Sequence, residues 1–166
     1  VQIAALTTVQ FGGFTPGDLA VLTAGQLDGL SAAKVATLSN AQMGALSSEQ
    51  INSLSTVQIA ALSSAQIAGL TTKQEAGLTV AQIKALSAAQ LSGLSSAHIK
   101  GLTADQVGGL SAQIENLSKS QIAGFEAGDF AIVGTGLFSS NQFSGMTTVQ
   151  KKAYWAAGGM IGLSST

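Results

Sequence analysis

A leucine stands at every eighth position through most of this chain, and the residues between the leucines follow one pattern. The consensus is L-[ST]-x-x-Q-[ILV]-x-[AG], as in "LSSAQIAGL" at 62–70 and "LSAAQLSGL" at 86–94. Leu6 and Phe14 extend the register towards the start of the chain. The uninterrupted leucines are at 22, 30, 38, 46, 54, 62, 70, 78, 86, 94, 102 and 110. A fixed internal period of this kind predicts a repeat architecture.

A period of eight fits neither a continuous helix nor a strand. At about 100° per residue, eight residues advance a helix by about 800°, so the leucines would drift by about 80° per repeat and form no stripe. In a strand, the leucine and the isoleucine five positions later would point to opposite faces. A disordered Ser/Thr-rich segment would lack apolar residues at regular intervals.

The polar residues of the octad predict a helix that starts and stops within one repeat. Ser or Thr followed three residues later by Gln forms a capping box, in which each residue satisfies a backbone N–H of the other. The flanking Leu and Ile then occupy the two positions of a hydrophobic staple. The Gly or Ala before the next Leu can end the helix, since Gly suits the left-handed C′ conformation.

We therefore predict an all-α fold, a solenoid of very short capped helices with one helix per eight-residue repeat. Helices this short are not stable alone, so each must share its apolar face with its neighbours. Leu and Ile should lie inside, Ser, Thr and the variable residues outside, and the small residues should allow close approach of neighbouring helices. The sequence does not fix the number of octads per turn; we expect two, with alternating direction.

Departures from the octad predict local irregularities. The segment "LSAQIENL" at 110–117 is one residue short, which predicts a kink or a register shift. Glu75 and Lys151 replace the staple isoleucine. We expect both side chains to face solvent, and a contact with another subunit is the alternative.

Two further segments match each other, "FTPGDLAVL" and "FEAGDFAIV", in which Asp18 and Asp129 replace Gln. Pro16 stands at the first helical position, where proline is tolerated. After Phe125 the register loosens at "IVGTGLF" before it resumes. We divide the chain into a repeat solenoid at 1–125 and irregular C-terminal repeats with a cap or assembly segment at 126–166.

The composition excludes several classes of function. Only 9% of the 166 residues are charged and the net charge is −1, so we expect neither nucleic acid nor an acidic membrane surface as a partner. No apolar run approaches the roughly 20 residues of a transmembrane helix. The chain has no cysteine, which excludes disulfides and thiol chemistry. It begins at Val1 rather than Met, which suggests a processed protein or an excised fragment.

No catalytic, cofactor-binding or metal-binding residue is predicted. His98 is the only histidine, and although Asp105 follows it closely, the repeat accounts for both. The acidic residues are isolated and match no calcium loop. The fragments "GTG" at 134–136 and "GGMIG" at 158–162 are too short to form a phosphate-binding loop. We do not expect an enzyme.

The octads, which span most of the chain, resemble the low-charge Leu/Ser/Thr/Gln repeats of large bacterial secreted and surface-attached proteins of the adhesin-like or haemolysin-like kind. This resemblance rests on repeat style and transfers no site residue. It implies export, an extracellular or cell-surface location, and a structural or adhesive role. The segment 126–137 departs from it.

Three functions remain open. The first is a self-assembling structural subunit of a filament, sheath or surface stalk, whose partners are other copies of itself. The second is an adhesin spacer or a surface-binding or ice-binding rod attached to a cell surface or matrix. The third is a membrane-active secreted toxin or translocator.

Overall fold

The computed structural model describes residues 3–134 and 138–159, and every regular element in these two ranges is a short helix. The elements are η1(Ile3–Ala5), α1(Thr8–Gly12), α2(Pro16–Ala20), α3(Ala24–Asp28), α4(Ala32–Ala36), α5(Asn40–Ala45), α6(Ser48–Asn52), α7(Thr56–Ala60), α8(Ser64–Ala68), α9(Thr72–Ala76), α10(Val80–Lys84), α11(Ala88–Leu91), α12(Ser96–Lys100), α13(Ala104–Gly109), η2(Ser111–Asn116), α14(Lys119–Ile122), α15(Asp129–Val133), α16(Ser140–Ser144) and α17(Thr148–Ala156). The predicted all-helical solenoid is confirmed, with a new helix in each octad.

Helices three repeats apart pack against each other, so three octads make one turn of the solenoid. One stack contains α1, α4, α7, α10, α13, α15 and α17. A second contains α2, α5, α8, α11 and η2, and a third contains α3, α6, α9, α12, α14 and α16. The expectation of two octads per turn is therefore wrong. Each bend at a leucine redirects the chain by much less than a full reversal, so three helices are needed to close a turn.

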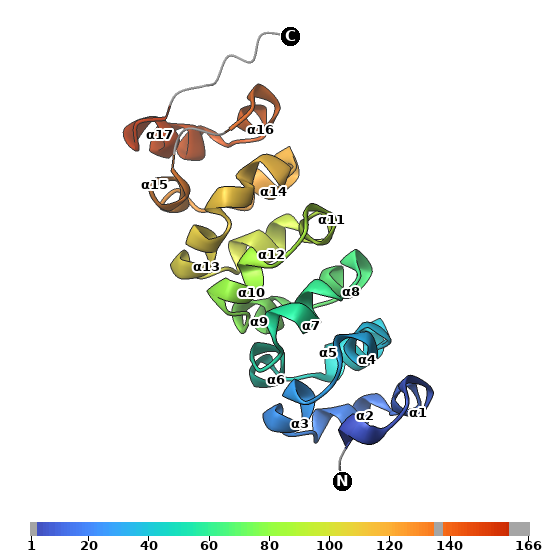
Figure 1. The fold of residues 1–166 in the computed structure, drawn as a ribbon. Coiled ribbons are helices and arrows are strands. Elements are labelled where there is room, and N and C mark those ends of the chain that lie inside the picture. Colours follow the sequence, from blue (N-terminus) through green and yellow to red (C-terminus); the bar gives the residue numbers. More distant parts are fainter. Residues whose placement is uncertain (1–2, 135–137, 160–166) are drawn as a thin grey trace.

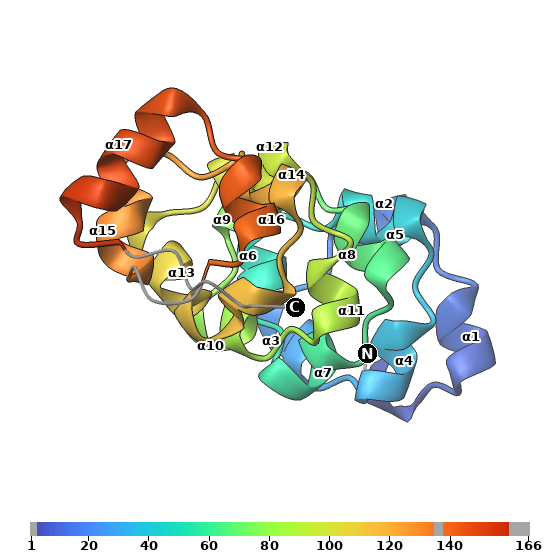
Figure 2. The ribbon, with the colours of Figure 1, turned by 90° about the horizontal axis from the view of Figure 1, so that it is seen from above.

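The three stacks build an elongated rod with α1 to α3 at one end and α15 to α17 at the other (Figure 1). The first stack runs from α1 at the lower right to α15 at the upper left of Figure 1. Seen from above, α1 and α17 lie on opposite sides of the molecule (Figure 2). Successive turns are thus displaced sideways, and the stack crosses the rod obliquely.

The capping boxes form as the sequence predicts. In α8, the Ser63 hydroxyl accepts a hydrogen bond of 3.2 Å from the backbone N–H of Gln66, and the Ser63 N–H donates to Gln66 Oε1 at 2.7 Å. Ser63 itself is extended, with φ −73° and ψ 158°. This extended residue breaks the preceding helix, and the reciprocal cap satisfies two N–H groups of the next one.

The apolar positions of the octad form one continuous core along the axis of the rod. In the repeat at 62–70, Ile67 is fully buried, and Leu62 and Leu70 are only 3% and 2% exposed. The predicted arrangement, with Leu and Ile inside, is confirmed for these residues. Because each helix has barely more than one turn, a single staple residue per helix supplies its buried face.

In the regular octads the helices do not end in the left-handed conformation that the sequence suggested; among the described residues, positive φ occurs only at Gly134 (79°) and Gly158 (87°), after α15 and α17. Gly69, at the C-cap of α8, has φ −83° and ψ −6°, which is ordinary right-handed backbone. Small residues are needed there for a steric reason. A Cβ atom on Gly77 would lie 2.7 Å from the carbonyl oxygen of Ser48 in the turn below. The predicted close approach of neighbouring helices is therefore confirmed, whereas the predicted backbone conformation is wrong.

The short repeat at 110–117 folds as the 3-10 helix η2, without a side-chain cap at its N-terminus. Gln113 Nε2 donates to the Leu86 carbonyl, 27 residues earlier, whereas Gln106 donates to Leu78, 28 residues earlier. The missing residue thus shifts the register by one, as predicted. Packing between α11 and η2 shows that the stack itself continues.

The two substituted staple positions differ from each other. Glu75 is 1% exposed, so the expectation that it faces solvent is wrong. The reason is that position 75 points into the core regardless of which side chain it carries. Lys151 is half-buried, and its ammonium group lies 5.2 Å from the ring centroid of Phe143.

The C-terminal helices continue the stacks and end in an aromatic cluster. Tyr154 is fully buried and packs edge-on against Phe130, Phe138 and Phe143. In the segment that matches 14–22, Asp129 Oδ2 accepts a hydrogen bond of 2.7 Å from the Glu126 N–H. Residues 160–166 of the predicted cap lie outside the described residues, and the domain division at residue 125 stays a prediction.

Candidate functional site

From the second turn of the solenoid onward, the glutamine of an octad joins two successive turns. Gln58 Oε1 accepts from the Ser55 N–H at 2.7 Å, which is the capping contact. Its Nε2 donates to the carbonyl oxygens of Leu27 at 2.9 Å and Leu30 at 2.7 Å, at the bend one turn below. Both ends of the amide are therefore satisfied, although Gln58 is only 2% exposed.

This inter-turn glutamine clamp recurs along the rod. Its donors are Gln42, Gln50, Gln58, Gln66, Gln74, Gln82, Gln90, Gln106, Gln113, Gln121, Gln142 and Gln150. The next turn covers the carbonyl oxygens at the bends. A buried carbonyl oxygen left without a hydrogen-bond donor would cost about 1–3 kcal/mol. The repeated polar side chain thus holds the turns together.

Sequence reasoning assigned these glutamines to the capping box alone and missed their second contact. A signal was present. A capping box accepts Glu as readily as Gln, yet the octads carry Gln at this position with few exceptions. Only the amide supplies a donor in addition to the acceptor that the cap needs.

Two departures from glutamine behave differently. Lys34 keeps the inter-turn contact, because its Nζ donates to the Ala4 carbonyl. His98 keeps the cap instead. The Ser95 N–H donates to His98 Nδ1 at 3.2 Å, and the His98 N–H donates to the Ser95 hydroxyl at 3.2 Å.

The imidazole of His98 meets the buried carboxyl group of Glu75 from the turn below. His98 Nδ1 lies 3.2 Å from Glu75 Oε1, and the two side chains are 13% and 1% exposed. Neither carboxyl oxygen of Glu75 has a conventional hydrogen-bond donor among the described residues. The acidic neighbour of His98 is thus Glu75, and Asp105 lies exposed on α13.

Burial controls the protonation of both groups. It raises the pKa of Glu75 to about 8, so the carboxyl group is mostly neutral at pH 7. It lowers the pKa of His98 from its ordinary value of 6.5, so the imidazole is neutral at the same pH. The pair therefore carries no net charge inside the rod.

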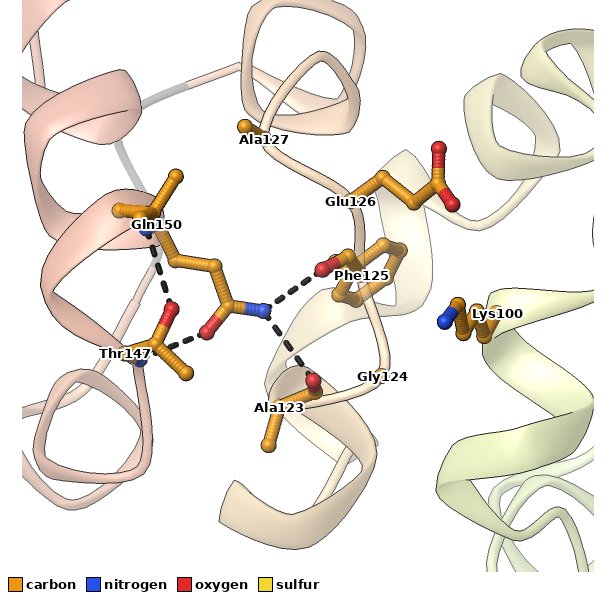
Figure 3. A pocket seen from close by; sticks show the side chains of 9 residues that line it. Lys100, Ala123, Gly124, Phe125, Glu126, Ala127, Thr147 and Gln150 are labelled. Carbon is orange, nitrogen blue, oxygen red and sulfur yellow. Dashed lines mark hydrogen bonds between the residues drawn. The ribbon is translucent and has the colours of Figure 1, made fainter.

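An open hollow of about 430 Å³ lies where the regular octads meet the segment after Phe125. Lys100 and Glu126 approach it from one side, and Thr147 and Gln150 form the opposite wall (Figure 3). Gln150 is committed to the clamp, since its Nε2 donates to the Phe125 carbonyl at 2.6 Å and its Oε1 accepts from Thr147 at 2.7 Å. Lys100 and Glu126 are the charged residues of its lining.

The remaining features that the sequence singled out form no site in the described part of the chain. Within 3–134 and 138–159 no group of three or more His, Cys, Asp or Glu residues could hold a metal ion. In the same residues, no helix is long and apolar enough to cross a membrane. The two glycine-rich fragments, at 134–136 and 158–162, lie partly outside the described residues.

Comparison with known proteins assigns the repeat. The ALTTAQ repeat matches at residues 19–56, 48–80 and 76–112, which together span more than half of the chain. No curated protein and no solved structure matches the chain. The matched segments cover the helices from α3 to α13, where the capped octads and the glutamine clamps are most regular. The chain belongs to the ALTTAQ repeat family.

Proposed function

We propose that this chain is a structural subunit of an extracellular filament, sheath or surface stalk, and that it assembles by stacking further turns of the same repeat on its ends. The observation that carries the proposal is the glutamine clamp. A ladder of identical inter-turn contacts has no intrinsic stopping point, and head-to-tail contacts that do not close produce filaments.

The use of the polar side chains supports a structural role. The buried glutamines cap a helix and bind the turn below, as Gln58 and Gln82 do. The hydroxyl groups of the N-cap residues are likewise committed to the caps. The recurrent polar groups thus form hydrogen bonds within the rod itself. No enzymatic step forms part of the proposal.

The first turn offers a surface that matches this mode of growth. Gln10 and Gln26 cap their own helices with Oε1, at 2.8 Å from the Thr7 N–H and 2.7 Å from the Thr23 N–H, as the clamp glutamines do. Leu22, at the leucine position of this turn, is half-buried, whereas its counterpart Leu46 is 3% exposed. An added turn would cover the apolar surface and supply carbonyl acceptors for the amides.

The proposed location outside the cell rests on the resemblance of the octads to secreted and surface-attached repeats. The low content of charged residues, 9%, agrees with a rod whose surface is partly covered by other copies. Surface biotinylation of intact native cells checks this location. Recovery of the unlabelled protein from the cell interior alone would contradict it.

Sedimentation velocity and negative-stain microscopy over a concentration series test the assembly. We expect linear oligomers that lengthen with concentration. Leu22→Lys places a charge on the half-buried edge of the first turn and should shorten them. Ala20→Lys is the matched control, because Ala20 is already exposed on α2. Monomers of the wild-type chain at every concentration would overturn the proposal.

One observation favours the second candidate, an adhesive rod. Val9, Val57 and Val149 are 86%, 68% and 65% exposed. They occupy the same position of α1, α7 and α17, which belong to one stack. Replacing all three by Ser should abolish attachment of the rod to its target surface if this candidate is right, and should leave linear assembly unchanged if the first one is.

A further inference from the structure

Two departures from the octad meet across the boundary between two turns. Glu75 occupies the staple position of α9, and His98 occupies the glutamine position of α12, which packs against α9 one turn later. Their side chains lie 3.2 Å apart, from Glu75 Oε1 to His98 Nδ1. At this boundary an ionisable pair thus stands where the consensus places an isoleucine and a glutamine amide.

A carboxyl oxygen and a ring nitrogen at this distance attract each other only when a proton lies between them. The Ser95 N–H already donates to His98 Nδ1, so this nitrogen acts as an acceptor in the capping box. When Glu75 is neutral, its hydroxyl can point at Nδ1 and share this one acceptor with the Ser95 N–H. After loss of that proton, a buried carboxylate would face a nitrogen lone pair, with no donor to compensate it.

Other charged groups on the packed helices lie at the surface. They are Lys73 on α9, Glu49 on α6, Lys100 on α12 and Lys119 on α14, and all four side chains are exposed. Burial is the cause of the raised pKa of Glu75, to about 8. The protonation of the pair therefore depends on its own surroundings inside the rod.

We propose that Glu75 and His98 form a pH-sensitive joint between α9 and α12, which is closed while the pair shares one proton and opens when alkaline pH removes it. Each turn of a solenoid contacts only its neighbours, so a weakened boundary can open locally while the remaining turns stay folded. The joint divides the rod into two halves that can separate or bend at this point.

The two groups act on opposite sides of neutral pH. The pKa of Glu75 is raised from 4.5 to about 8, so its contribution to stability is complete below pH 4.5 and is lost as the pH rises through 8. The pKa of His98 is lowered from 6.5, so its contribution is present above that value and is lost as the pH falls. The Glu75 term alone lowers the closed-to-open ratio roughly 100-fold between pH 6 and pH 9.

Hydrogen exchange measured by mass spectrometry at pH 6 and pH 9, corrected for intrinsic exchange rates, tests the joint. We expect the protection of amides in α9 and α12 to fall by one to two orders of magnitude. The protection of amides in α5, in the second turn, should change little. Unchanged protection of α9 and α12 would overturn the proposal. A uniform loss along the rod would also overturn it, because the effect would then not be local.

Two variants separate the titration from packing defects. Glu75→Gln keeps the shape and polarity of the side chain and removes its ionisation, so it should abolish the alkaline loss. The double variant Glu75→Ile with His98→Gln restores the consensus of the repeat and should be insensitive to pH. An alkaline loss in Glu75→Gln as large as that of the wild type would show that Glu75 is not the titrating group and would refute the joint.

Discussion

Gln82 Nε2 lies 2.6 Å from the carbonyl oxygen of Leu54, which is 28 residues earlier in the chain and one turn lower in the rod. The Oε1 atom of the same side chain accepts from the Thr79 N–H at 2.7 Å. One amide therefore fixes the start of its own helix and its position over the previous turn. Local and long-range structure depend on the same group.

Replacing Gln82 by Glu should separate these two tasks. A glutamate still accepts from Thr79, but its carboxylate cannot donate to the carbonyls of Leu54 and Ile51. We expect the free energy of unfolding, measured by urea denaturation, to fall by about 1–3 kcal/mol. Gln26→Glu is the control, because Gln26 caps α3 through Thr23 and its Nε2 makes no inter-turn hydrogen bond among the described residues. Equal losses in both variants would show that the clamp adds nothing beyond the cap.

The glycine at the end of an octad should be irreplaceable only where a turn lies against it. Gly77→Ala would place a Cβ atom 2.7 Å from the Ser48 carbonyl oxygen, and we expect a loss of about 1–3 kcal/mol in unfolding free energy. Gly25, inside α3, has nothing within 4 Å of an added Cβ. Gly25→Ala should instead stabilise the helix by about 0.5–1 kcal/mol. Thermal or urea denaturation of the two variants checks the opposite signs.

Asp18 replaces Gln in the capping box of α2 and should titrate below its ordinary range. Hydrogen bonds from Thr15 lower its pKa; the hydroxyl donates to Asp18 Oδ2 at 2.7 Å and the N–H donates at 2.8 Å. The cap is therefore present above pH 3.8 and is lost as the pH falls through the lowered pKa.

Thr15→Val removes the hydroxyl donor and keeps the N–H. We expect the pKa of Asp18, followed by NMR titration, to move up towards 3.8 without reaching it. Thr23→Val, in the next cap, is the control and should leave Asp18 unchanged. An unaltered pKa in Thr15→Val would contradict the role of the hydroxyl group.

Local features of this fold could be predicted from the sequence because the residues that start, cap and bury each helix lie within a single octad. Ser63 and Gln66 define a helix start within four residues, and Ile67 must be buried because it is the staple. Such features depend on contacts close in sequence. The predictions of the capping boxes and of the apolar core are therefore confirmed.

The number of octads per turn could not be predicted, because it depends on which carbonyl group each amide reaches. Nothing within "LSTVQIAAL" indicates that Gln58 meets Leu30 rather than a residue of the preceding helix. The meeting of Glu75 and His98 was hidden for the same reason, since they become neighbours only in a solenoid with three octads per turn. Sequence reasoning also placed Glu75 in solvent, since it weighed the charge of the side chain above the inward direction of the staple position.

The short repeat at 110–117 allows the octad rule to be tested by insertion. Gln113 still clamps the Leu86 carbonyl at 2.7 Å, but its Oε1 is buried without a hydrogen-bond partner. The cap is missing because Ser111 precedes Gln113 by two residues instead of three.

One alanine inserted after Ser111 restores the consensus spacing, so the Ser111 N–H can reach Gln113 Oε1. We expect η2 to become a capped α-helix and the free energy of unfolding to rise by about 1 kcal/mol. The same insertion after Ser63, where the spacing is already correct, should destabilise the rod, and urea denaturation of both variants compares them. A loss of stability at both sites would mean that the shortened repeat is adapted to its place in the rod.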